Sequence, residues 1–192
     1  EWLDNLLDQE DKILSMIIFS MTETALLFSS FAILKSFQSN GNNLIPVIVR
    51  GTNQSAIDED LHGMLSAEII NNYYKELGTP LKDDTKRVEK ILEAVDYAYS
   101  HECRIVDMAF LTDTLNKVTK DEMKEFVKYR LNVYLERIHL PHRFEVGECS
   151  IIDWFEKNTY SYKMVDFFTK GVGSEYESSW NTDGFGKSWE EQ

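Results

Sequence analysis

The sequence predicts an all-α protein in which a bundle of helices surrounds one apolar core. Four segments are either apolar throughout or carry apolar residues at helical spacing, at residues 12–38, 53–78, 83–111 and 119–138. No segment of useful length alternates apolar and polar residues, so we expect neither a sheet nor a hairpin. With 192 residues, 43% of them hydrophobic, the chain is long enough to bury one sizeable core.

The first predicted helix, residues 12–38, is apolar nearly all round and carries one carboxylate, Glu23, near its middle. A buried carboxylate must be neutral, paired or bound to a metal ion, because an isolated charge is costly away from water. The helix is long enough to cross a membrane, but a central charge costs about 2.5–3.5 kcal/mol even on the insertion scale. We therefore expect a buried central helix and no membrane.

The remaining helices are predicted from their ends. Residues 39–46 form a turn, and a second helix is expected to begin near Asn53 and to end at Gly78, a natural C-cap. The third has an acidic first turn, and the fourth begins at Thr119, where the order Thr-Lys-Asp-Glu matches a capping box. Residues 151–168 are expected to form one or two short helices.

Composition limits the environment and the partners. A formal charge of -13, without any run of Lys and Arg, would repel phosphate backbones, so nucleic acid is not an expected partner. Cys103 and Cys149 stand apart without C-x-x-C spacing, which favours a reducing, cytoplasmic compartment. The acidic first residues lack the features of a secretory signal and an initiator Met, as in a processed product, a trimmed chain or a piece of a longer protein.

The strongest chemical signal combines Glu23 with the pair Glu59 and His62. Glu59-x-x-His62 places two ligands at i and i+3 on one helix face, and a Glu from a neighbouring helix completes half of a di-iron or di-manganese carboxylate site. Carboxylates with one imidazole suit iron or manganese, and the lack of thiolates argues against structural zinc. A helical interaction module without metal would leave Glu23 unexplained.

A second half-site is a tempting alternative. Glu102 on the third helix and Glu136-x-x-His139 on the fourth, added to the first three residues, would make a free-standing ferritin-like di-iron oxidase or iron-binding protein. However, His139 lies where Leu-Pro ends the helix, and Glu136 has charged neighbours. Glu102 also stands in a polar stretch beside His101. We therefore expect Glu102, Glu136, His139 and His101 to be surface residues.

Six sequence blocks follow one another in a characteristic order along nearly the whole chain. They are ETALLFSSFAILKSF (23–37), LIP (44–46), NQSAIDEDLH (53–62), EFVKYRL (125–131), IDWFE (152–156) and DFFTKGVGSEY (166–176). In this order they resemble the small subunit of class I ribonucleotide reductase, especially its eukaryotic-like branch. The last block is specific, because metal binding does not require it and ferritins have no counterpart.

The resemblance implies roles for individual residues around the half-site. Glu23 would be a terminal ligand, Glu59 a bridging ligand and His62 a ligand of the same ion. Asp58 would orient a histidine ligand and relay the radical. One departure is Ile57, which stands where the family usually has Arg. The apolar wall of the radical pocket would include Leu27 and Phe31.

The resemblance also divides the chain into two parts. Residues 1–165 would be the C-terminal half of a ferritin-like helical domain, containing its second helix pair and later helices. Residues 166–192 would be a partly flexible tail that binds the large catalytic subunit. In that tail Tyr176 would pass the radical on, while Phe185 and Trp189 would anchor the partner.

The family's earlier helix pair, with its own Glu-x-x-His and the radical tyrosine, would lie upstream of Glu1. The expected partners are therefore an N-terminal half on a separate polypeptide or missing segment, the large subunit, and a second small subunit. The expected cofactor is a di-iron centre, with manganese as the alternative. The expected activity is that of a ribonucleoside-diphosphate reductase small subunit, an oxidoreductase that uses O2 to produce and store the oxidant for making deoxyribonucleotides.

Overall fold

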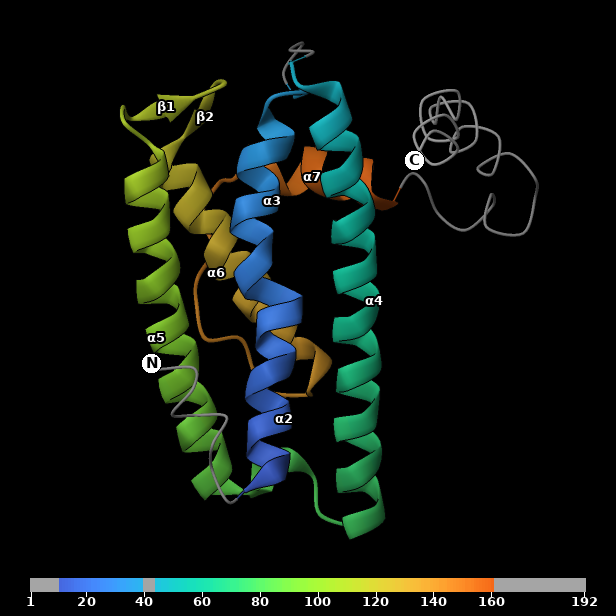
Figure 1. Cartoon of the computed structure of the whole chain (residues 1–192). Helices are drawn as coiled ribbons and strands as arrows, with labels where there is room; N and C mark the ends of the chain where they lie inside the picture. The colour runs from blue at the N-terminus through green and yellow to red at the C-terminus, as the bar shows by residue number, and fades with distance from the viewer. Residues whose placement is uncertain (1–10, 40–43, 161–192) are drawn as a thin grey trace, which may run out of the picture.

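The structure is a computed structural model that describes residues 11–39 and 44–160, and within these residues helices dominate (Figure 1). This confirms the predicted all-α class. The elements in chain order are α2 (Lys12–Met21), η1 (Thr22–Leu26), α3 (Leu27–Ser36), α4 (Pro46–Leu77), η2 (Leu81–Asp83), α5 (Thr85–Ala109), β1 (Thr114–Leu115), β2 (Val118–Thr119), α6 (Lys120–Arg137) and α7 (Ser150–Tyr160).

The central element is the predicted apolar helix, which is made of α2, η1 and α3 in direct succession. Asp11 caps its N-terminus by accepting a hydrogen bond from the Leu14 main-chain N–H at 3.0 Å. Its middle turn, η1, is a π-helix. α4 and α5 lie on either side of this helix and α6 lies behind it (Figure 1). The bundle core therefore forms around the segment with the most continuous apolar character.

By length and composition alone, Lys12–Ser36 could also cross a membrane. Half of the most apolar part of this segment is buried inside the bundle. The fully buried side chains include Leu14, Ile17, Ile18 and Phe28. This burial agrees with the expected core helix.

α4 begins earlier than the sequence indicated, at Pro46 rather than near Asn53. Proline at the first helical position fits its fixed φ and its missing N–H. Thr52 is of a residue type common at helix N-caps, but here it lies inside the helix. Its hydroxyl donates a hydrogen bond to the Ile48 carbonyl at 2.9 Å. The predicted C-cap is confirmed, since Gly78 ends the helix with a φ of 68°.

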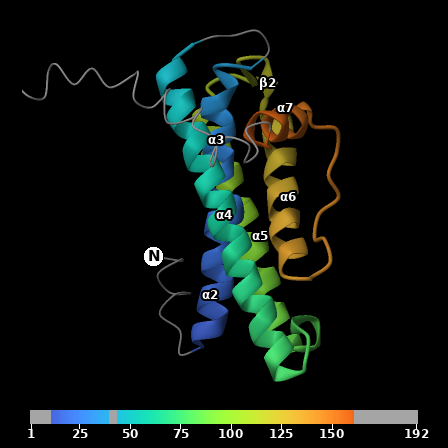
Figure 2. The ribbon, with the colours of Figure 1, turned by 90° about the vertical axis from the view of Figure 1, so that its right-hand side faces the viewer.

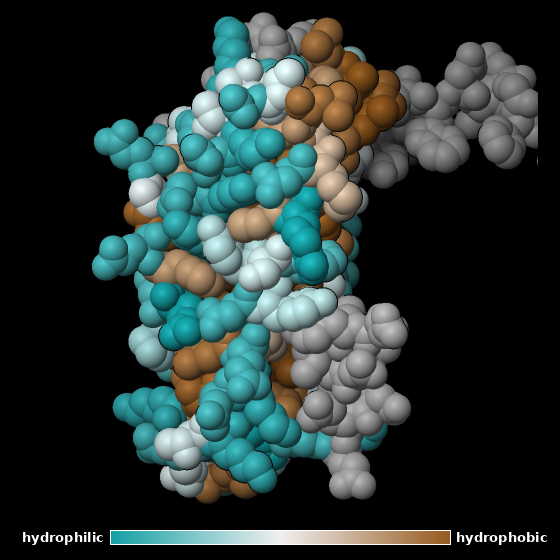
Figure 3. All heavy atoms as spheres, turned by 90° about the vertical axis from the view of Figure 1, so that its left-hand side faces the viewer, coloured by the Kyte–Doolittle hydropathy of each residue, from teal (hydrophilic) through white to brown (hydrophobic). Residues whose placement is uncertain are grey.

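α5 is amphipathic and contributes one face to the core. The side of the molecule that carries α5 is mostly hydrophilic at its surface, with hydrophobic side chains gathered at one upper edge and in a smaller area lower down (Figure 3). The buried residues recur at helical spacing and include Ile91, Ala94, Val95, Ala98 and Val106.

A short hairpin between α5 and α6 was not predicted from the sequence. β1 and β2 pair as antiparallel strands of two residues each. The two residues that connect them, Asn116 and Lys117, have φ values of 51° and 66°. Two positive φ values in a two-residue loop are typical of a type I′ turn, which the right-handed twist of paired strands favours. Strands this short carry no alternating pattern, so periodicity could not reveal them.

α6 and α7 complete the described part of the bundle. The predicted capping box is confirmed, because Thr119 accepts from the Glu122 N–H at 3.1 Å and Glu122 accepts from the Thr119 N–H at 3.0 Å. α7 lies near the β-hairpin end of α6 (Figure 2) and contacts α3, α4 and α6. It agrees with the start of the short helical region expected at residues 151–168, whose remainder lies outside the described residues.

Candidate metal centre

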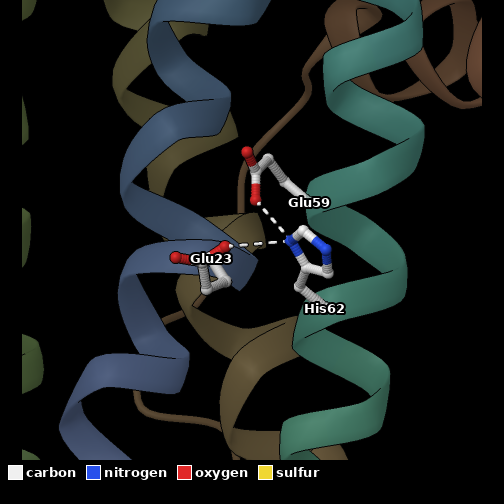
Figure 4. Close-up of side chains that lie close together, drawn as sticks. All are labelled: Glu23, Glu59 and His62. Carbon is white, nitrogen blue, oxygen red and sulfur yellow. Dashed lines mark hydrogen bonds and ion pairs between the residues drawn. The ribbon is translucent and has the colours of Figure 1, made fainter.

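Glu23, Glu59 and His62 converge between the central helix and α4 (Figure 4). The Nδ1 atom of His62 lies 3.0 Å from Glu59 Oε2 and 3.4 Å from Glu23 Oε2. One ligand atom from each of the three residues lies within 4.8 Å of the others. The sequence-predicted ligands are therefore brought together, with spacings compatible with a shared metal ion.

Local helix geometry and close packing explain this convergence. Glu59 and His62 are separated by about one turn of α4, so their side chains leave the same face. Glu23 lies in the π-helical turn η1, and π-helical turns are frequent at functional sites. Gly63 of α4 lies against Thr24 of η1 so closely that a Cβ atom at Gly63 would collide with it. The missing side chain therefore lets the two ligand-bearing elements approach.

The three groups perturb one another's protonation. A hydrogen bond with Glu59, burial and repulsion from Glu59 raise the pKa of Glu23. The same hydrogen bond, with help from His62, lowers the pKa of Glu59. The hydrogen bond to Glu59 is also the main cause that raises the pKa of His62. Two carboxylates beside one imidazole are a donor set that a divalent cation fits, because the cation would relieve the repulsion between the carboxylates.

A buried charged cluster lies behind the ligands and was missed at the level of sequence. Arg130 of α6 donates to the Thr24 carbonyl from Nε at 3.1 Å and from Nη2 at 2.7 Å, and Nη2 also lies 3.2 Å from Asp60 Oδ1. Arg137 Nη2 donates to the same Asp60 oxygen at 2.6 Å. A signal for Asp60 was present, because it falls on the buried stripe of α4 that includes Ala56 and Ala67.

The expectation for Glu102 was wrong, because this residue is buried with only 2% exposure. It is hydrogen bonded to Ser29 of α3, and His101 Nδ1 lies 3.3 Å from its Oε1. Burial raises the pKa of Glu102. Polar neighbours in the sequence pointed to the surface, but position 102 belongs to the core-facing stripe of α5.

The other members of the alternative half-site are surface residues, as predicted. The Glu136 side chain is 72% exposed, and its Oε2 atom lies 3.5 Å from Nε2 of His142. His139 and His101 are also exposed. Glu102 is buried against α3, whereas Glu136 faces solvent. Among the described residues, the three side chains at positions 102, 136 and 139 do not form a metal-ligating group like that at Glu23.

The remaining predicted site residues have varied surroundings. Phe31 is half-buried and packs edge-on against Phe28, with ring centroids 5.6 Å apart. Leu27 is half-buried, and Asp58 is exposed on α4 directly before Glu59. The tail residues lie outside the described part of the chain: Tyr176, Phe185 and Trp189.

The fold and the site together define an all-α bundle protein with a carboxylate–histidine candidate metal centre. The model of the family described as ribonucleotide reductase, small chain, matches residues 1–150, and the chain belongs to this family. No curated protein matches the chain. Membership confirms the ferritin-like helical fold and assigns a role in ribonucleotide reduction, an oxidoreductase activity that serves deoxyribonucleotide synthesis. The family works with a large catalytic subunit, dimerises, and generally uses a di-iron or manganese centre.

Proposed function

We propose that this chain is a component of a class I ribonucleoside-diphosphate reductase small subunit and supplies half of its radical-generating di-metal site. The observation that carries the proposal is the convergence of Glu23, Glu59 and His62 inside a bundle of this family. Glu23 would bind one ion terminally, Glu59 would bridge, and His62 would bind the same ion. When bound, iron or manganese would supply the one-electron chemistry with O2 that the family requires.

Three ligands are too few for two ions, and this supports a shared site. Helical di-metal carboxylate sites take a Glu from each of two helices and a Glu-x-x-His pair from each of the other two. This chain contributes one such set through η1 and α4. We therefore propose that a separate polypeptide or missing segment, the N-terminal half of the small subunit, supplies the other set.

The surface around the ligands supports a covering partner. The His62 side chain is 57% exposed, although a metal-bound imidazole is usually held by further contacts. Apolar side chains beside it on α4 are also exposed, and such a patch favours association. These side chains are Leu61, Met64, Leu65 and Ile69.

Other residues of the chain would orient the metal ligands and exclude water from the centre. Leu27 and Phe31 would form part of the apolar wall around the radical site, and Asp58 would orient a histidine ligand and relay the radical. The tail from residue 166 would bind the large subunit, with Tyr176 as the relay residue. The proposed complex is cytoplasmic and contains two copies of the small subunit.

The test is metal analysis of the purified chain, alone and with any polypeptide carrying Glu-x-x-His that co-purifies or is encoded nearby. The chain alone should bind metal weakly and incompletely, because metal affinity depends on a complete, preformed shell. The complex should hold two ions per pair of polypeptides. Two tightly bound ions in the isolated chain would instead favour a free-standing ferritin-like oxidase.

A further inference from the structure

We infer that Arg130 is a positioning residue for the candidate metal centre, which it holds in shape by binding the main chain of the π-helical turn that carries Glu23. The inference rests on the proposed metal-binding function of Glu23, Glu59 and His62. Arg130 touches none of these three side chains in the hydrogen bonds and ion pairs of the described residues. Its effect would act through Thr24 and Asp60.

The first contact is with the π-helical turn itself. A change from α-helical to π-helical bonding redirects the carbonyls of the turn, and a buried carbonyl needs a donor. Thr24 is buried, and its carbonyl accepts two hydrogen bonds from the Arg130 guanidinium, at 3.1 and 2.7 Å. Because Thr24 follows Glu23 directly, fixing its peptide group restricts the direction of the Glu23 side chain.

The second contact joins the turn to α4. The Nη2 atom that binds Thr24 also lies 3.2 Å from Oδ1 of Asp60, which follows Glu59 directly. One planar guanidinium therefore connects the neighbours of two proposed ligands that come from different helices. A fixed fork of donors suits this task better than a flexible ammonium group.

The guanidinium itself is held firmly. Arg130 is 1% exposed, and its Cζ atom lies 3.6 Å from the centroid of the Phe28 ring. Stacking on an aromatic face and charge-assisted hydrogen bonds restrict its motion in a site with little water. Arg137 offers a matched comparison, because its Nη2 atom binds Asp60 Oδ1 at 2.6 Å, and within the described residues its guanidinium bonds to Asp60 rather than to the Thr24 carbonyl.

The test compares Arg130→Met, Arg130→Lys and Arg137→Met in the full chain, together with its co-purifying polypeptide if there is one. Co2+ titration followed by visible absorption reports affinity and ligand geometry. Arg130→Met should weaken Co2+ binding by roughly 10- to 100-fold and alter the absorption spectrum, the range seen when residues that orient ligands are removed. Arg130→Lys should recover part of the affinity, and Arg137→Met should keep the wild-type spectrum.

A second measurement does not depend on metal. Hydrogen exchange of the metal-free protein should be faster in Arg130→Met at the amides of residues 22–28, but not in Arg137→Met. If Arg130→Met does not fold, Arg130→Lys serves in both measurements, and it should still differ from Arg137→Met in the same direction.

The outcomes separate this inference from the proposed function. Unchanged Co2+ affinity and unchanged exchange in folded Arg130 variants would overturn the inference, as would equal effects of the Arg130 and Arg137 substitutions. Failure of the wild-type complex to bind Co2+ would contradict the proposed function. In that case hydrogen exchange would still decide whether Arg130 holds the π-helical turn.

Discussion

Gly63 of α4 lies directly against Thr24 of η1, and a Cβ atom at Gly63 would collide with the Thr24 hydroxyl and lie 2.9 Å from Arg137 Nη1. Gly63 directly follows His62 in the sequence, and Thr24 directly follows Glu23. The distance between the two ligand-bearing elements therefore depends on the absence of one methyl group.

Gly63→Ala should lower the free energy of unfolding by roughly 1–3 kcal/mol, the usual cost of overpacking a well-packed interior. Gly51 is the control on the same helix, since nothing lies within 4 Å of a Cβ placed there. Gly51→Ala should raise stability by about 0.5–1 kcal/mol, because alanine restricts the unfolded chain and favours the helix. Urea unfolding followed by circular dichroism measures both changes, and a stable Gly63→Ala variant would contradict the close approach.

Substitution of the proposed ligands should separate them from the similar pair at the C-terminal end of α6, where Glu136 lies in the helix and His139 just beyond it. Glu59→Ala or His62→Ala should abolish the absorption band of the metal-loaded complex, because each substitution leaves the ligand shell incomplete. Glu136→Ala and His139→Ala should leave the band nearly intact, since both side chains face solvent. Absorption spectra and metal content of the complex provide the measurement. Equal damage from both pairs would mean that the half-site interpretation is wrong.

Buried Glu102 should make stability depend on pH in a defined direction. Its pKa in the folded protein is raised above the ordinary value of 4.5, mainly by desolvation. Above that value the unfolded chain releases its proton while the folded protein retains it. The resulting contribution to stability is complete below pH 4.5 and is lost as the pH rises through the folded-state pKa.

The free energy of unfolding, measured with urea from about pH 4 to 8, should therefore fall less steeply with rising pH in Glu102→Gln than in the wild type. Glutamine keeps a hydrogen-bonding group of the same shape beside Ser29 but does not titrate. Glu136→Gln, at an exposed position, is the control and should follow the wild-type curve. Identical curves for all three proteins would refute the predicted effect of Glu102.

Deleting residues 181–192 should weaken binding to the large subunit without changing metal content. The segment contains Phe185 and Trp189, and aromatic anchors carry a disproportionate share of interface energy, roughly 2 kcal/mol or more each. Thr182→Ala is a suitable control within the same segment. Titration calorimetry with the large subunit measures the affinity, and undiminished binding by the truncated chain would exclude this segment as the docking element.

Tyr176→Phe should separate radical relay from docking. Phenylalanine fills the same space but has no O–H group to oxidise, so nucleotide reduction should fall to background while binding and metal content persist. The assay needs the full chain, the large subunit and the proposed N-terminal partner. Full turnover by this variant would remove the relay role and weaken the proposed reductase function itself.

Local sequence patterns predicted the parts of the site that depend on one helix at a time. The candidate ligand pair Glu59 and His62 is defined by i, i+3 spacing, and the candidate ligand Glu23 by its apolar neighbours. The helix ends at Gly78 and Thr119 were also predicted, because capping depends on residues within a few positions. The start of α4 was misplaced by about two turns, because Pro46 was assigned to the preceding turn although proline also suits the first position of a helix.

The sequence by itself determined the helical class, the central apolar helix and the identity of the three candidate ligands, because helical periodicity and runs of apolar residues are local properties of the chain. The tertiary structure decided that Glu102 is buried, that Asp60 belongs to a charged cluster and that Arg130 binds the Thr24 carbonyl. Arg130 and Thr24 are 106 positions apart, so only the packing of α6 against η1 brings them together. Sequence spacing describes neighbours on one helix, whereas a buried contact between helices depends on how their faces meet.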